Sequence, residues 1–204
     1  MAPNFPPSES NDPDTWFILE SQIRECYGRV VYSHKAHEKN ADIYLSQLRR
    51  TKFFQIFLSA ITTGGIFGVI FSNGSEILAI ITATTATIQF FLNAYIKEYN
   101  LSEAAERHSV TASKLWLIRE SYLSLLADIA SREVSLEQII ERRDHLQEDL
   151  ALIYEKAPRT FPKAYQAAQK GLKLNEELTF SDEEIDVFLP LPMRRRQTSE
   201  KPRN

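Results

Sequence analysis

The sequence predicts an all-α integral membrane protein, in which a hairpin of two transmembrane helices is flanked by long amphipathic helices. Residues 53–96 contain a single charged side chain, Glu76. A turn-forming Ser-Asn-Gly-Ser cluster at 72–75 divides this stretch into halves of 19 and 20 residues. As a helix, each half is about 30 Å long, which matches the hydrocarbon core of a bilayer. The flanking sequence is polar and repeats its apolar residues at helical spacing.

A buried hairpin inside a soluble helical bundle is the alternative. Such core helices normally keep one polar face, or need partner helices apolar enough to cover them completely. The first half, 53–71, holds eleven Leu, Ile, Phe and Val residues. Together they favour insertion by about 3–7 kcal/mol, partly offset by polar residues and glycines. The remaining helices are amphipathic and cannot cover such surfaces, so the membrane hairpin is favoured.

The N-terminal part divides into two segments. Residues 1–14 are rich in proline and are predicted to be disordered, with no apolar region typical of a signal peptide. Residues 15–52 predict a cytoplasmic juxtamembrane helix that contains no proline and runs into the first span, with Gly28 as a weak point. Its apolar stripe comprises Trp16, Leu19, Ile23, Tyr27, Val30, His34, Ala41, Tyr44, Leu45 and Leu48.

Residues 97–175 predict further cytoplasmic helices, the first continuing directly from the second span. Its heptad-like stripe either forms a coiled coil or docks on the N-terminal helix. Ser135-x-x-Gln138 and Ser181-x-x-Glu184 are capping boxes. Residues 176–204 are predicted to be a mostly flexible basic tail. The heptad-like stripe comprises Ala104, His108, Thr111, Leu115, Ile118, Tyr122, Leu125 and Ile129.

Each predicted span carries polar residues on one side of its helix. A carboxamide that faces lipid is costly, so these residues indicate either hydrogen bonds between helices or a water-filled lumen. Two helices cannot enclose a channel, so any pore must be oligomeric. The polar set is Gln55, Ser59 and Thr62 in the first span and Thr82, Thr85, Gln89 and Asn93 in the second.

Ala60, Gly64 and Gly68 form a row of small residues on the opposite side of the first span. Small residues let two helices approach closely in lipid. The row is a candidate packing surface, either for closing the hairpin or for association between subunits.

The charges predict the orientation. Cations precede the first span and follow the second, while the connecting loop has no Lys or Arg, so both termini are expected in the cytoplasm. The lone Cys26 suits a reducing compartment, and a net charge of −3 gives no indication of nucleic-acid binding.

No catalytic, cofactor or metal site is predicted. His34 and His37 stand near Glu38 and Cys26, but no CxxC or HExxH motif accompanies them. The sequence has no phosphate loop and no nucleophile elbow, so we expect no enzyme. The spans lack the ionisable residues of a pump or a coupled transporter.

The stretch WFILESQIRECYGRVVYSHKAHEKNAD at 16–42, followed by a membrane hairpin and a long helix, resembles the SLATT proteins. These are two-transmembrane effectors associated with SMODS nucleotide cyclases and SLOG sensors in bacterial defence. The CYGRVVYSHKAHEK part resembles the branch often encoded beside reverse transcriptases. Within it, the candidate regulatory juxtamembrane motif comprises Tyr27, Arg29, His34 and His37.

The resemblance implies a homo-oligomeric effector of the bacterial inner membrane that forms a pore or otherwise disrupts the membrane after a signal. A sensor, nucleotide cyclase or reverse transcriptase encoded nearby is the implied partner besides the lipid bilayer. The alternative is a non-conducting anchor or scaffold that recruits a partner through its cytoplasmic helices.

Overall fold

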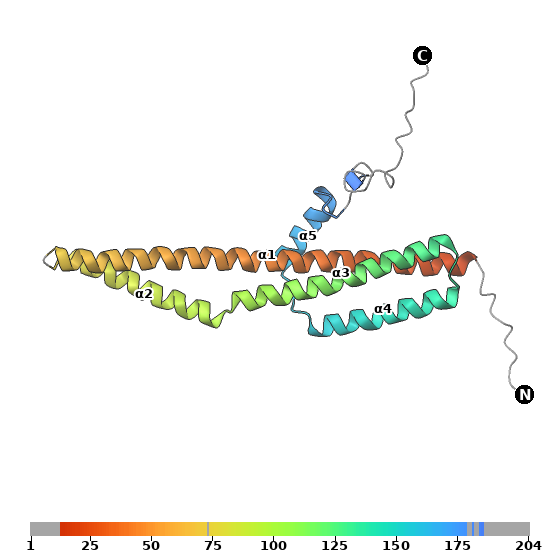
Figure 1. Cartoon of the computed structure of the whole chain (residues 1–204), viewed down its shortest axis with the longest axis horizontal. Coiled ribbons are helices and arrows are strands. Elements are labelled where there is room, and N and C mark those ends of the chain that lie inside the picture. Colours follow the sequence, from red (N-terminus) through yellow and green to blue (C-terminus); the bar gives the residue numbers. More distant parts are fainter. Residues whose placement is uncertain (1–12, 73, 179–180, 182–183, 186–204) are drawn as a thin grey trace, which may run out of the picture.

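The structure, a computed structural model, describes residues 13–72, 74–178, 181 and 184–185. This described part is helical and contains no strand, which confirms the predicted all-α class. Helices α1 to α4 form an elongated rod, and α5 projects from its side (Figure 1). The helices are α1 (Pro13–Phe71), α2 (Glu76–Glu98), α3 (Leu101–Ser131), α4 (Leu136–Lys156) and α5 (Pro162–Leu174).

Helix α1 joins the juxtamembrane region to the first span without a break. It has 59 residues, so it is about 90 Å long. Pro13 occupies its first position, where a missing N–H costs nothing. No proline follows inside the helix and Gly28 does not interrupt it. The N-terminal half and the first span are therefore parts of one continuous helix.

The predicted hairpin turn lies between α1 and α2. The N–H of Ser72 donates to the Gly68 carbonyl at 3.0 Å, and that of Gly74 donates to Val69 at 3.2 Å. Gly74 has a φ of +83°, a conformation that glycine adopts without a steric penalty. The chain therefore reverses tightly and returns α2 along α1.

Two helices are long and apolar enough to cross a membrane, and no residue in their most apolar windows is buried. A hairpin in the core of a soluble bundle would be mostly covered by its neighbours. The exposed apolar surface therefore agrees with the predicted membrane hairpin and not with the soluble alternative.

The prediction that the second span continues directly into the next helix is wrong. α2 ends at Glu98, and α3 begins at Leu101 after a break. The side chain of Asn100 accepts the N–H of Glu103 at 3.2 Å and donates to its carboxylate at 2.8 Å. Asn100 thus provides an acceptor for a free N–H in the first turn of α3 and allows a new helix to begin. The chain changes direction at this point (Figure 1).

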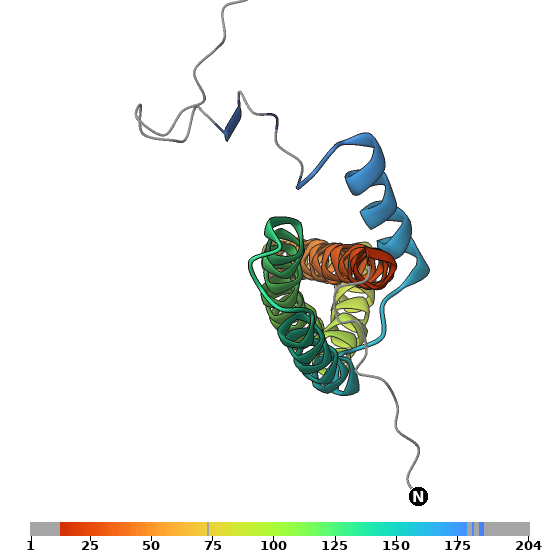
Figure 2. The same ribbon diagram turned by 90° about the vertical axis from the view of Figure 1, so that its right-hand side faces the viewer.

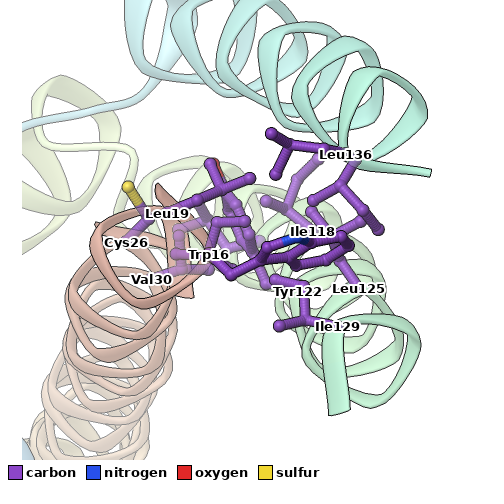
Figure 3. Packing of buried hydrophobic residues seen from close by; sticks show 12 residues of the cluster. Trp16, Leu19, Cys26, Val30, Ile118, Tyr122, Leu125, Ile129 and Leu136 are labelled. Carbon is purple, nitrogen blue, oxygen red and sulfur yellow. The ribbon is translucent and has the colours of Figure 1, made fainter. Parts of the chain in front are cut away.

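The apolar stripes of α1 and α3 pack against each other within one chain. Figure 3 shows Trp16 and Val30 on the side of α1 that faces α3 and its Tyr122, Leu125 and Ile129. Ile23, Leu115 and Tyr122 are fully buried in this core. The docking of α3 on the N-terminal helix, one of the two predicted outcomes, is therefore the one observed.

Helices α4 and α5 lie on different sides of α1 (Figure 2). α4 begins at the predicted capping box, where Ser135 Oγ accepts the N–H of Gln138 at 3.3 Å. Leu136 and Ile139 bury its first turn against α3. α5 packs small residues, Ala164 and Ala168, against α1.

Most of the two terminal segments predicted to be disordered or flexible lies outside the described residues. Glu177, assigned by that prediction to the flexible tail, instead contacts α1. Its carboxylate lies 2.9 Å from Lys35 Nζ and 3.0 Å from Lys39 Nζ. Ser181 and Glu184 form the predicted reciprocal capping box, with N–H to side-chain distances of 2.8 and 3.3 Å.

Candidate functional site

The polar residues of the two membrane helices face each other. We call this set, Gln55, Ser59, Thr62, Thr82, Thr85, Gln89 and Asn93, the polar seam. Gln55 Nε2 donates to Asn93 Oδ1 at 3.0 Å. Gln89 Nε2 donates to Ser59 Oγ at 2.5 Å, and Gln89 Oε1 accepts a long bond of 3.5 Å from Thr62 Oγ1. Each of the three carboxamides thus forms at least one hydrogen bond between α1 and α2.

The two threonines that α2 contributes to the polar seam bond to the backbone of their own helix. Thr82 Oγ1 donates to the Leu78 carbonyl at 2.7 Å, and Thr85 Oγ1 donates to Ile81 at 2.6 Å. A hydroxyl bonded one turn back in its own helix needs no partner on α1. In this conformation the interhelical bonds therefore depend on Gln55, Gln89 and Asn93.

Gly65 lies at a close approach of α1 and α2 and was not predicted from the sequence. A Cβ added there would overlap the Thr82 hydroxyl and lie 3.2 Å from Thr82 Cβ. Gly65 follows Thr62 by three positions, so it continues the polar side of α1. The three-residue spacing from Thr62 therefore indicates that Gly65 faces α2. The row of small residues four positions apart predicts a packing surface on the opposite side of the helix.

The row of Ala60, Gly64 and Gly68 is only partly in contact with α2. A Cβ at Gly68 would lie 3.5 Å from Leu78 Cδ1. Ala60 is exposed, and a Cβ at Gly64 would meet no atom within 4 Å. The close approach of the helices is thus made at Gly65, and two members of the row face away from the hairpin.

A histidine cluster lies outside the spans, where α1 meets α3. His37 Nδ1 and His108 Nδ1 are 3.0 Å apart, and both rings are almost completely buried. One nitrogen must donate and the other accept, so the bond requires at least one neutral ring. Tyr44 stacks on His108 with ring centroids 5.7 Å apart. The ring of Tyr44 also contacts that of Phe161, with centroids 5.5 Å apart.

Burial holds these histidines in their neutral form. Burial is the main reason why the pKa of His37 is lowered to about 4, and the neighbouring His108 and His34 lower it further. Burial also lowers the pKa of His108. The pKa of His34 is lowered by burial, although Glu38, at 3.5 Å from its Nε2, opposes the effect.

Tyr27 and Arg29 of the candidate regulatory motif do not join the histidines. Tyr27 packs against the apolar core, and Arg29 donates to Cys26 Sγ at 3.4 Å. His34 and His37 lie further along α1, at the junction with α3. Among the residues that the structure describes, no group of His, Cys, Asp and Glu is arranged to hold a metal ion.

Asn40 connects α1 to α5. Its side chain is fully buried, and its Nδ2 donates to the Ala36 carbonyl at 2.8 Å. Its Oδ1 accepts the N–H of Phe161, the N-cap residue of α5, at 3.1 Å. α5 is therefore fixed to α1 at its first turn by one buried amide.

Replacing Asn40 with leucine is expected to release α5. The change leaves the Phe161 N–H without its acceptor in a partly buried position, which costs about 1–3 kcal/mol. Amide hydrogen exchange over 161–174 should rise, while exchange in α3 stays protected. Ser33→Ala is the control, since it removes a more exposed bond between helices, from Tyr154 Oη at 2.7 Å. Equal exchange of α5 in Asn40→Leu and wild type would contradict this role.

Comparison with known proteins agrees with this architecture. The profile of SMODS and SLOG-associating 2TM effector domain family 4 matches residues 19–184, which is most of the chain. No match was found among curated proteins or solved structures. The two transmembrane segments of the family description correspond to the two candidate spans of the hairpin, while the match itself extends over α3 to α5. The protein is therefore a membrane protein that belongs to the SMODS and SLOG-associating 2TM effector domain family 4, a family of effector domains of bacterial conflict and antiphage systems.

Proposed function

We propose that the chain is an inner-membrane effector that oligomerises and, after a sensor or nucleotide signal, forms a pore or otherwise disrupts the membrane. The polar seam is the observation that carries this proposal. Three carboxamides lie at membrane depth in a hairpin whose outer surface is apolar. Polar groups in such a position are expensive and commonly functional.

In the proposed mechanism, both termini are cytoplasmic and the packing of α3 on α1 holds the resting state. Because α1 is continuous, a signal that changes this packing also moves the first span. The carboxamides then exchange their partners across the hairpin for water, in a ring of hairpins contributed by several subunits. The trigger is a sensor, a nucleotide cyclase or a reverse transcriptase encoded nearby.

Substitution of Gln89 and Asn93 by leucine tests the pore-lining role. We expect strongly reduced ion flux from Gln89→Leu/Asn93→Leu in triggered cells, because leucine offers water no polar surface. Thr84→Leu/Thr87→Leu is the matched control: both threonines are exposed side chains of α2 that bond only to their own backbone. Undiminished flux in correctly inserted Gln89→Leu/Asn93→Leu protein would rule out the assignment.

Gln89→Glu separates a pore lining from a purely structural role. A ring of carboxylates in a lumen favours cations, so the reversal potential under an ion gradient should shift toward cation selectivity. A glutamine that only bonds Ser59 within the hairpin would change stability and leave the selectivity of any conductance unaltered.

A non-conducting scaffold is the second candidate, and the completed bonds between Gln55 and Asn93 and between Gln89 and Ser59 favour it. A scaffold would recruit its partner through the cytoplasmic helices. Its expression with the trigger present would leave the membrane potential, followed with a voltage-sensitive dye, unchanged. Depolarisation under the same conditions favours the effector that disrupts the membrane.

A further inference from the structure

A groove of about 910 Å³ runs along α1 and is walled by α2 and α5. One end is polar and cationic, with Lys39, Arg50 and Lys163. The other end is apolar, with Phe54, Phe57 and Ile88. Neither the family assignment nor the proposed function gives this groove a role.

The change from polar to apolar lining coincides with the expected surface of the membrane. Arg50 precedes the uncharged stretch by three positions, and Phe54 is its second residue. Since the helix rises about 1.5 Å per residue, Arg50 lies about 6 Å from Phe54 along the axis. A molecule that filled the groove would have its polar part at the headgroup level and its apolar part in the hydrocarbon.

The cations of the groove are largely unpaired. Arg50 bonds Ser46 Oγ at 3.3 Å, and neither Arg50 nor Lys163 forms an ion pair with the residues that the structure describes. Lys39 is paired with Glu177 at 3.0 Å. Asp42 is the one carboxylate among the lining residues described. The excess of positive charge fits an anionic ligand rather than a zwitterionic one.

We propose that this groove binds an anionic phospholipid. The phosphate lies between Arg50 of α1 and Lys163 of α5, and the first part of an acyl chain lies along Phe54, Phe57 and Ile88. A guanidinium is well suited to hold phosphate oxygens, and a lysine adds a point charge. Because Lys163 belongs to α5 and Ile88 to α2, one lipid contacts both helices and the long α1 at once.

Native mass spectrometry of the full chain in detergent tests the proposal. Dioleoylphosphatidylglycerol is added to one sample, dioleoylphosphatidylcholine to a second and glycerol 3-phosphate to a third. We expect retained phosphatidylglycerol, little phosphatidylcholine and no retained glycerol 3-phosphate, because the site needs both a charge and an acyl chain. Equal retention of the two lipids, or tight binding of glycerol 3-phosphate, would overturn the lipid assignment.

Two matched double variants distinguish binding in the groove from a general attraction of anionic lipid to the basic juxtamembrane surface of the protein. Arg50→Gln/Lys163→Gln should bind phosphatidylglycerol about tenfold or more weakly, since each contact contributes on the order of a fewfold to affinity. Arg49→Gln/Lys52→Gln removes two exposed cations of α1 that do not line the groove and should bind as the wild type does. Circular dichroism confirms that both variants are folded. An equal loss in the two variants, or no loss in the first, contradicts the site.

Discussion

Gly65→Val is expected to separate the two membrane helices, whereas Gly64→Val leaves them packed. At Gly65 even a Cβ would overlap the Thr82 hydroxyl, and Thr82 Cβ lies only 3.2 Å away. At Gly64 the same atom would meet nothing within 4 Å. Overpacking a closely packed contact costs about 1–3 kcal/mol, and the additional methyl groups of valine place Gly65→Val at the upper end of that range. The bonds of Gln89 and Asn93 then lose their geometry.

Cross-linking across the hairpin measures this separation. With Cys26 replaced by alanine, cysteines at 55 and 93 are positioned for a short dimaleimide, because the native side chains meet at 3.0 Å. Cross-linking should be efficient with glycine at both 64 and 65, stay efficient with Gly64→Val and fall sharply with Gly65→Val. Equal cross-linking in the two valine variants would mean that the helices do not approach at Gly65.

A smaller pair of changes tests the identity of the contact. Gly65→Ala should weaken the hairpin, and adding Thr82→Ala should restore much of the loss because the overlapping hydroxyl is gone. The remaining Cβ at 3.2 Å is tight but needs a shift of only tenths of an ångström. Independent effects of the two substitutions would show that the atoms at 65 and 82 do not meet.

Apart from the break before α3, the helices were predicted from the sequence, and so was the side that α3 buries, because both follow from spacing within one segment. Leu45, near the end of the stripe predicted for α1, is exposed. The predicted stripe is buried from His108 to Ile129, while Ala104 at its start is half-buried, and the capping box at Ser135 starts α4. The break before α3 was also encoded, as the capping residues Asn100-x-x-Glu103.

Contacts between distant segments were not predictable in the same way. A helical wheel groups Gln55 with Ser59 and Gln89 with Asn93, but it does not give the rotation of one helix relative to the other. His37 and His108 are 71 positions apart, and Asn40 and Phe161 are 121 apart. Their pairing depends on the register of α1 against α3 and α5, which packing of the whole chain determines.

Acidification is expected to destabilise the packing of α3 on α1 through the histidine pair. An unfolded histidine has a pKa near 6.5, whereas that of His37 in the folded chain is about 4. Between these values the unfolded chain binds more protons than the folded chain. The stabilisation that comes from keeping His37 neutral is therefore fully present above about pH 6.5 and decreases as the pH falls toward 4. The loss from His37 amounts to about 2 kcal/mol by pH 5 and about 3 kcal/mol by pH 4.

The carboxylate of Glu177 acts in a different pH window from the histidines. Lys35, followed by Lys39, lowers the pKa of Glu177 to about 2. Stability from that carboxylate is therefore present above about pH 4.5 and is lost only as the pH falls toward 2. His34 faces Glu38, Lys35 and Arg119, and its lowered pKa acts in the same direction as that of His37. Measurements between pH 7 and pH 5 thus report on the buried histidines.

Thermal unfolding in detergent, followed by circular dichroism from pH 7 to pH 5, checks this expectation. His37→Gln/His108→Gln keeps a donor and an acceptor at the contact but has nothing to protonate there, so its pH dependence should be much weaker. His145→Gln is the control: His145 is an exposed histidine of α4 at 3.7 Å from Glu148, and its loss should leave the wild-type slope. A wild-type protein that is equally stable at pH 7 and pH 5, or an unchanged slope in the double variant, would contradict the role of the pair. A weaker slope in the double variant alone identifies the His37–His108 contact as the point where protons act on the packing of α1 and α3.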